Sequence, residues 1–143
     1  MEQKPTDELL DDLLSSPSLD AFVQANELPS CTLAEYLQQM LAQKGLSQPT
    51  VVRMANLSDA YGYQIFAGIR QHPSRDKVLQ IAFAMGLTPR EANRALEYAG
   101  ASSLYPKVRR DAIILYCLDR GTSLQKVDEE LYRLGERTIS PSA

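Results

Sequence analysis

Along most of the chain, hydrophobic residues recur every three or four positions among polar ones, which is the spacing of a helix buried on one face. Residues 33–44 show it clearly, with apolar side chains at Leu33, Tyr36, Leu37, Met40 and Leu41. No segment has the strict alternation of a strand, so the predicted fold is all-α. The other predicted helices span residues 6–15, 19–25, 48–55, 59–67, 75–85, 89–98, 107–120 and 122–134.

Residues that start and stop helices support these boundaries. Thr32 with Glu35 and Thr88 with Glu91 are predicted capping boxes, and serines precede other predicted helices. Gly45 suits the left-handed conformation that ends many helices. Residues 136–143 follow the last predicted helix and are expected to form a frayed tail.

The helices divide into three predicted regions. Residues 1–30 form an acidic N-terminal helical arm, and residues 31–100 form the central helical domain. Residues 101–143 form a C-terminal helical pair and tail. The pair is predicted to be a dimer face or an effector-sensing extension, or to complete the core of the domain.

Two short predicted helices dominate the centre of the chain. The helix at residues 48–55 ends at Asn56, which tolerates a positive φ, and Ser58 can already cap the helix at residues 59–67. Helices joined by so short a turn cross steeply, as in a helix-turn-helix. The second helix would then carry the functional residues, which favours a binding surface over a catalytic pocket.

Residues 32–87 contain a recognisable set of positions around these two helices. They are Lys44, Gly45, Leu46, Ser47 and Gln48, then Leu57 and Ser58, then Ile65, Gly68 and Arg70, and finally Pro73, Ser74 and residues 79–87. At these positions the chain resembles the phage-repressor/Cro family of helix-turn-helix domains, called the XRE family in bacteria. The resemblance implies a lambda-repressor-like helical bundle and a transcriptional regulator that binds double-stranded DNA, with a homodimer expected.

The sequence departs from this family at several positions. Val52 stands where Ala is preferred, Asn56 where Gly is preferred, and Gly62 where a buried Ile or Val is usual. Asp59 and Phe66 replace residues that are more often polar or basic. Gly within a helix costs about 1 kcal/mol relative to Ala. Gly62 therefore suggests close approach of another backbone, from either a neighbouring helix or DNA.

The resemblance also implies roles for individual residues. The second helix of the motif would lie in the major groove, where Gln64 could pair with adenine and Ala60 could touch a thymine methyl group. Tyr61 and Tyr63 have packing as an equal alternative, and Phe66 is expected in the core. The residues expected to face the groove are Ser58, Asp59, Ala60, Tyr61, Tyr63 and Gln64. Those expected at phosphates are Gln48, Thr50, Arg53, Arg70, Arg75 and Lys77.

Charge is distributed unevenly along the chain. The whole chain carries a net charge of −3, but residues 1–30 hold seven acids against one lysine, a net of −6. Residues 44–110 hold ten bases against four acids, a net of +6. This asymmetry suggests a basic binding face and a separate acidic arm. The alternative is that these charges only solvate helix faces.

Other classes of protein are disfavoured. No apolar run reaches the roughly 20 residues of a membrane span, and two cysteines do not make a disulfide framework, which points to a cytoplasmic protein. No pattern for a phosphate-binding loop, a metal cluster or a catalytic nucleophile is present. With His72 as the single histidine, we expect no enzyme activity, no cofactor and no metal.

A second function remains open beside DNA binding. The helix-turn-helix scaffold could instead serve as a protein–protein interaction or adaptor module, because one fold hosts many functions. The aromatic residues of the second motif helix and the leucines of the acidic arm favour this alternative. The arm itself is expected either to mask the basic face or to bind a protein partner.

Overall fold

The computed structural model describes residues 6–15, 18 and 31–141. The chain divides into two units, residues 1–30 and residues 31–143, which are considered separately. Secondary structure in the described residues is helical, without a strand, which confirms the all-α prediction. In these residues, no helix combines the length and the apolar character needed to cross a membrane.

The first unit contains helix α1, Thr6–Ser15, with the bounds predicted from the sequence. Three of its leucines, Leu10, Leu13 and Leu14, are exposed. The helix predicted at residues 19–25 lies outside the described residues. The predicted roles of the arm, masking and partner binding, therefore remain predictions.

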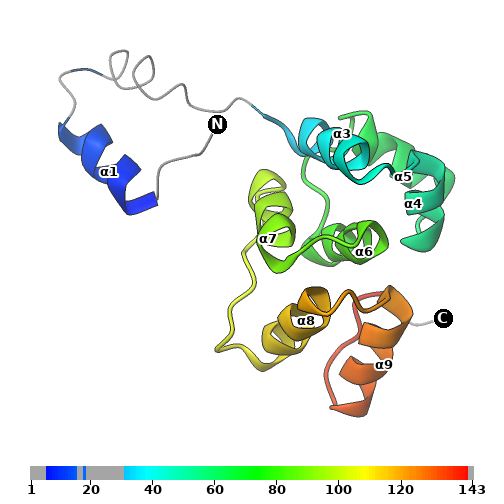
Figure 1. Ribbon diagram of the computed structural model, residues 1–143. Coiled ribbons are helices and arrows are strands. Elements are labelled where there is room, and N and C mark those ends of the chain that lie inside the picture. The colour runs from blue at the N-terminus through cyan, green and yellow to red at the C-terminus, as the bar shows by residue number, and fades with distance from the viewer. Residues whose placement is uncertain (1–5, 16–17, 19–30, 142–143) are drawn as a thin grey trace. The chain divides into compact units, whose positions relative to one another are not determined.

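The second unit contains seven helices in the described residues (Figure 1). Each begins and ends within two residues of its predicted bounds, because the stop and start signals are local. The helices are α3 (Leu33–Lys44), α4 (Gln48–Met54), α5 (Asp59–Phe66), α6 (Arg75–Met85), α7 (Pro89–Tyr98), α8 (Arg109–Asp119) and α9 (Leu124–Arg133).

Most of the predicted caps are formed, with two differences. The Thr88 and Glu91 pair forms a complete capping box. Thr32 Oγ1 accepts from the Glu35 backbone N–H, but the Glu35 carboxylate accepts from the Thr32 hydroxyl rather than from its backbone, so that box is half formed. Ser47 precedes α4 without capping it, because its hydroxyl donates to Thr50 Oγ1 at 2.8 Å.

Helix α6 lies at the centre of the second unit. Every residue from Val78 to Met85 is buried, and α6 contacts α4, α7 and α9. A helical segment that is buried around its whole circumference must be covered by other elements on every side. The hydrophobic core is therefore organised around α6.

Helices α8 and α9 supply part of this cover. Their residues Ile114, Leu118, Val127 and Leu131 are at most 4% exposed and belong to the same hydrophobic cluster as α6. In Figure 1 they lie below α6 and α7, which they contact. Of the three predictions for this pair, completion of the core is the one that the packing supports.

The segment after α9 is docked, so the prediction of a frayed tail is wrong for residues 136–141. Ile139 is 3% exposed. The Asp128 carboxylate accepts hydrogen bonds from the backbone N–H groups of Ile139 and Ser140, at 2.6 and 3.2 Å. Arg110 donates to the carbonyl oxygens of Arg137 and Thr138, at 2.9 and 3.2 Å. These contacts hold the tail as a fixed part of the unit.

An ion pair joins the start of α6 to α8. The Arg75 guanidinium donates from both terminal nitrogens to the Asp111 carboxylate, at 2.9 and 2.8 Å. The same guanidinium donates to the carbonyl oxygens of Ser102 and Ser103, both at 2.9 Å. Asp111 is 3% exposed and also accepts from the Tyr105 N–H at 3.0 Å. Arg75 thus fastens the C-terminal helices and their linker to α6.

This ion pair makes stability depend on pH. Burial on its own raises the pKa of Asp111, but the hydrogen bonds from Arg75 and Tyr105 outweigh it and hold that pKa below its ordinary value. Because the folded-state pKa is lowered, the unfolded chain binds the proton more readily. The stabilisation is complete above the ordinary Asp pKa, near 4, and is lost as pH falls through the folded-state pKa.

We predict that Asp111→Asn lowers the free energy of unfolding at pH 7 by about 2–4 kcal/mol, because it leaves Arg75 without its charged partner. Urea denaturation would measure this. The difference from wild type should shrink as pH falls below about 4. The control is Asp119→Asn, also on α8, whose side chain is 70% exposed. Equal losses in the two variants at pH 7 would contradict the assignment.

Candidate nucleic-acid interface

Helices α4 and α5 are joined by a four-residue turn, Ala55 to Ser58. Asn56 has φ 60°, as predicted, and Ser58 Oγ accepts from the Tyr61 N–H at 3.1 Å to begin α5. The turn is tied to the core from behind, because Gln80 on α6 donates to the Ala55 carbonyl oxygen at 2.8 Å. The turn between the two helices is therefore anchored to α6.

Gly62 lets α5 lie directly against α4. A Cβ added at Gly62 would lie 2.5 and 2.6 Å from the two methyl carbons of Val52. Both residues are buried. Of the two alternatives that the sequence left open, close approach of a neighbouring helix is the one found. The two departures from the family compensate for each other. Val52 on α4 is larger than the preferred Ala, and Gly62 on α5 has no side chain and so leaves room for it.

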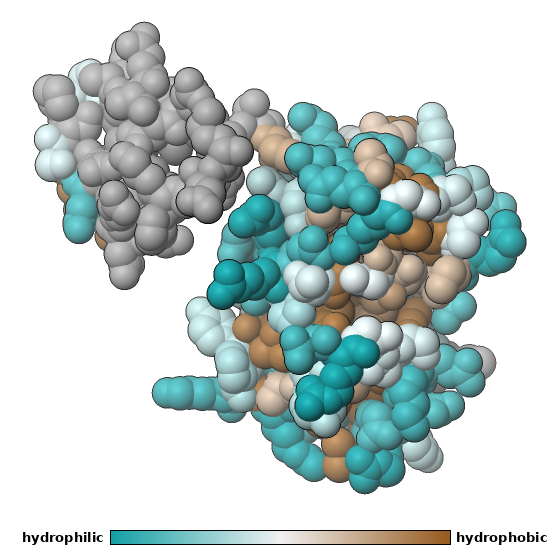
Figure 2. Space-filling model, in the orientation of Figure 1, coloured by the Kyte–Doolittle hydropathy of each residue, from teal (hydrophilic) through white to brown (hydrophobic). Residues whose placement is uncertain are grey.

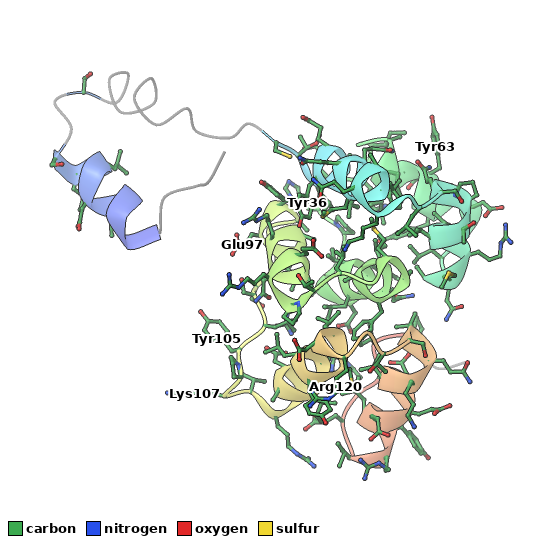
Figure 3. The ribbon with its side chains drawn as sticks, viewed as in Figure 1. Tyr36, Tyr63, Glu97, Tyr105, Lys107 and Arg120 are labelled. Atoms are coloured by element: carbon green, nitrogen blue, oxygen red, sulfur yellow. The ribbon has the colours of Figure 1, made fainter. Side chains whose placement is uncertain are left out.

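The outer face of α5 carries Asp59, Ala60 and Tyr63, all exposed. Figure 3 shows the Tyr63 side chain projecting away from the helices, and it is 59% exposed. Phe66 is 2% exposed and lies in the core, as expected. The positions predicted to face DNA at the start of α5 are thus accessible, and for Tyr63 packing is not the role found.

A cluster of four side chains, which we call the Tyr61 cluster, lies beside this face. The Arg70 guanidinium lies 4.8 Å from the centre of the Tyr61 ring, and the Lys77 ammonium lies 5.7 Å from it. Both are within the range of cation–π attraction. Gln64 Oε1 accepts from two nitrogens of Arg70, at 3.3 and 3.0 Å. Tyr61 and Gln64 therefore hold two cations next to the exposed face of α5.

This cluster changes the expected roles of two residues. Gln64 is predicted to pair with adenine, but its side-chain oxygen already accepts hydrogen bonds from Arg70. Tyr61 is half-buried beneath two cations rather than projecting outward. Contacts within the protein therefore compete with base reading at both positions.

The residues expected at phosphates differ in their availability. Arg53 is exposed and forms no ion pair with a described residue, whereas Gln48 Oε1 accepts from Gln38 Nε2 at 3.1 Å. Thr50 accepts from Ser47. The Arg75 guanidinium is held by Asp111 and two carbonyl oxygens, so it is a structural residue and we leave it out of the interface.

The sequence did not draw attention to two apolar residues that flank these helices. Met54, at the end of α4, is 58% exposed, and Ile69, in the loop after α5, is 67% exposed. Spacing gave no signal for their exposure, because Met54 lies three residues after the buried Val51 and Ile69 lies four residues after the buried Ile65. Figure 2 shows hydrophobic residues across the middle of the visible face of the second unit, with hydrophilic residues around them.

Comparisons of the chain with protein-family models, with curated proteins and with solved structures found no significant match.

We predict that Gly62→Ala destabilises the protein by about 1–3 kcal/mol, because the stiff Val52 side chain cannot yield to the added methyl group. Adding Val52→Ala should restore part of this loss, which urea denaturation of both single variants and the double variant would measure. The control is Ala60→Gly on the exposed face of α5, which measures how an exchange of Ala and Gly changes stability through helix propensity alone. A more stable Gly62→Ala single variant would contradict the proposed contact.

Proposed function

We propose that the chain is a DNA-binding transcriptional regulator and that α4, the turn and α5 form a lambda-repressor-like helix-turn-helix. Helix α5 would lie in the major groove of double-stranded DNA. The observation that carries the proposal is the Tyr61 cluster, which holds Arg70 and Lys77 beside the exposed start of α5. A solvent-facing helix start flanked by oriented cations suits a groove bordered by phosphates.

The exposed residues divide between bases and phosphates in this proposal. Ala60 contacts a thymine methyl group, and Asp59 accepts from the amino group of cytosine. Tyr63 projects far enough to contact a base edge or the sugar–phosphate backbone. Arg53, Arg70 and Lys77 contact phosphates, which fix the protein on the duplex without reading its sequence.

The proposed regulator would act as a homodimer, because one small module buries too little surface for tight specific binding. We further propose a cytoplasmic location and no enzymatic activity. The two cysteines, Cys31 and Cys117, are free thiols, in keeping with a reducing compartment.

A second candidate is a protein-interaction module on the same helices. The exposed apolar side chains Met54, Tyr63 and Ile69 favour it, since aromatic residues and methionine are enriched in protein interfaces. Asp59 at the start of α5 also repels phosphate. We rank this candidate second because it does not account for Arg70 and Lys77, the two cations that the Tyr61 cluster holds.

Fluorescence anisotropy with mixed-sequence duplex DNA across a salt series tests the first candidate. We predict that Arg53→Gln/Arg70→Gln weakens binding and makes the slope of log K against log salt shallower by about two, because two phosphate contacts are lost. The control is Lys126→Gln/Arg133→Gln, which removes the same charge from exposed positions on α9.

Equal weakening by both double variants would indicate attraction by net charge alone and would contradict the assigned face. If the wild-type chain does not bind DNA even at low salt, the protein-interaction candidate takes its place.

We also predict that Tyr61→Leu weakens DNA binding about threefold to tenfold, whereas Tyr61→Phe leaves it near wild type, because only the aromatic ring attracts the two cations. Circular dichroism would check that both variants fold. Equal weakening by Tyr61→Phe would show that the hydroxyl contacts DNA, and Tyr61 would then be a base-reading residue rather than a support.

A further inference from the structure

Helix α8 has an outer face that carries apolar side chains. Tyr116 is 58% exposed, and Val108, which precedes the helix, is 50% exposed. Ala112 lies between them at four-residue spacing and is partly exposed, so the three share one side of the helix. The opposite side packs into the unit through Asp111, Ile114, Cys117 and Leu118. Contiguous apolar residues on a surface mark an interaction site.

Four residues form a line along this outer face, which we call the α8 seam. They are Arg109, Ala112, Tyr116 and Asp119, spaced three, four and three residues apart, so they follow one another along one side of the helix. The side chains at the two ends are well exposed, Arg109 by 64% and Asp119 by 70%. The seam therefore reads as a cation, a small residue, a large residue and an anion.

This order is complementary to itself when the helix is reversed. In an antiparallel pair of α8 helices centred on Ile114, Arg109 of each copy lies opposite Asp119 of the other, and Ala112 lies opposite Tyr116. A twofold axis repeats each pairing, so opposite charges meet at both ends and a large side chain meets a small one at both inner positions. A parallel pair would instead bring Arg109 against Arg109 and Asp119 against Asp119.

We propose that a second copy of this chain docks on the α8 seam through an antiparallel pair of α8 helices. This assigns a contact surface to the homodimer proposed above. The dimer stands on α8 alone, whereas its use on DNA rests on the proposed DNA-binding function.

The contacts within one copy leave the seam able to form these pairs. Arg109 donates one terminal nitrogen to Glu136 at 3.4 Å, and a guanidinium has further donors for Asp119 of the second copy. The Arg120 guanidinium lies 3.6 Å from the centre of the Tyr116 ring. This contact holds the ring in place, which lowers the entropy that docking would cost. Asp119 has a longer pair with Arg120, at 3.7 Å.

The proposed dimer is weak. Helix α8 has 11 residues and is therefore about 16 Å long. A contact between two helices of this length buries less than about 1,000 Å², which is typical of transient complexes, and we expect a dissociation constant of roughly 10–100 μM. Two copies on neighbouring half-sites of one duplex have a high effective concentration, so a weak contact is sufficient there.

The first test is sedimentation equilibrium of the full chain without DNA. Wild type should show a reversible monomer–dimer equilibrium. Tyr116→Ala should weaken dimerisation at least about tenfold, because a central aromatic residue carries much of the energy of an interface. The control is Tyr132→Ala on α9, which removes a side chain of the same kind that is 80% exposed and lies outside the seam. It should dimerise like wild type.

The second test exchanges the charges at the ends of the seam. Arg109→Asp and Asp119→Arg should each dimerise at least about tenfold more weakly than wild type, because like charges then meet at both ends. An equal mixture of the two variants should regain dimerisation, since every facing pair in the mixed dimer is again of opposite charge. Circular dichroism would check that each variant folds, and the tyrosine pair decides if one does not.

No dimer of wild type at concentrations well above the expected dissociation constant would overturn the proposal, and so would equal weakening by Tyr116→Ala and Tyr132→Ala. Single charge variants that dimerise like wild type, or a mixture that stays monomeric, would overturn the antiparallel arrangement. These measurements contain no DNA. A monomeric chain that binds DNA would therefore refute the dimer alone, and a dimer that binds no DNA would refute the proposed function alone.

Discussion

The fold depends on covering α6, a helix that is buried on every side after its first turn. From Val78 to Met85 every residue is buried, and Gln80 is the one polar side chain among them. Neither α4 nor α7 can enclose such a helix from one side, so α9 and the docked tail complete the enclosure. The C-terminal third of the chain is therefore structurally inseparable from the segment that resembles a helix-turn-helix.

The helices themselves could be predicted because their signals are local. Gly45 and Asn56 mark helix ends within a few residues of the capping residues that begin the next helix, and both have the positive φ expected of them. The docking of the tail could not be predicted in this way. Ile139 is a single apolar residue without periodicity, and the Asp128 carboxylate that holds its backbone lies on the preceding helix.

The exposure of three predicted site residues is found, whereas their DNA contacts stay predictions. The family resemblance placed Asp59, Ala60 and Tyr63 on the groove-facing side of the second motif helix, and all three are exposed on α5. Spacing does not show which polar side chains bind one another across loops. The engagement of Gln64 by Arg70, and of Arg75 by Asp111 from 36 residues away, therefore emerged only from the three-dimensional arrangement.

These internal partners also reduce the basic character of the middle of the chain. Four of its ten bases are held by carboxylates: Lys44 by Glu91, Arg75 by Asp111, Arg109 by Glu136 and Arg110 by Asp76. On α4 and α5 and the segments that follow them, Arg53, Arg70 and Lys77 form no ion pair with a described residue. Net charge along the sequence thus overstates the charge available to a partner.

About three phosphate contacts per chain would give a salt slope of only about three, and correspondingly weak binding by one copy. The loss of one of three cations is then a large fraction of the electrostatic attraction. Lys77 is held in the Tyr61 cluster by its contact with the Tyr61 ring. An interface that depends on so few charges is therefore more sensitive to the loss of one such contact than a broad basic surface would be.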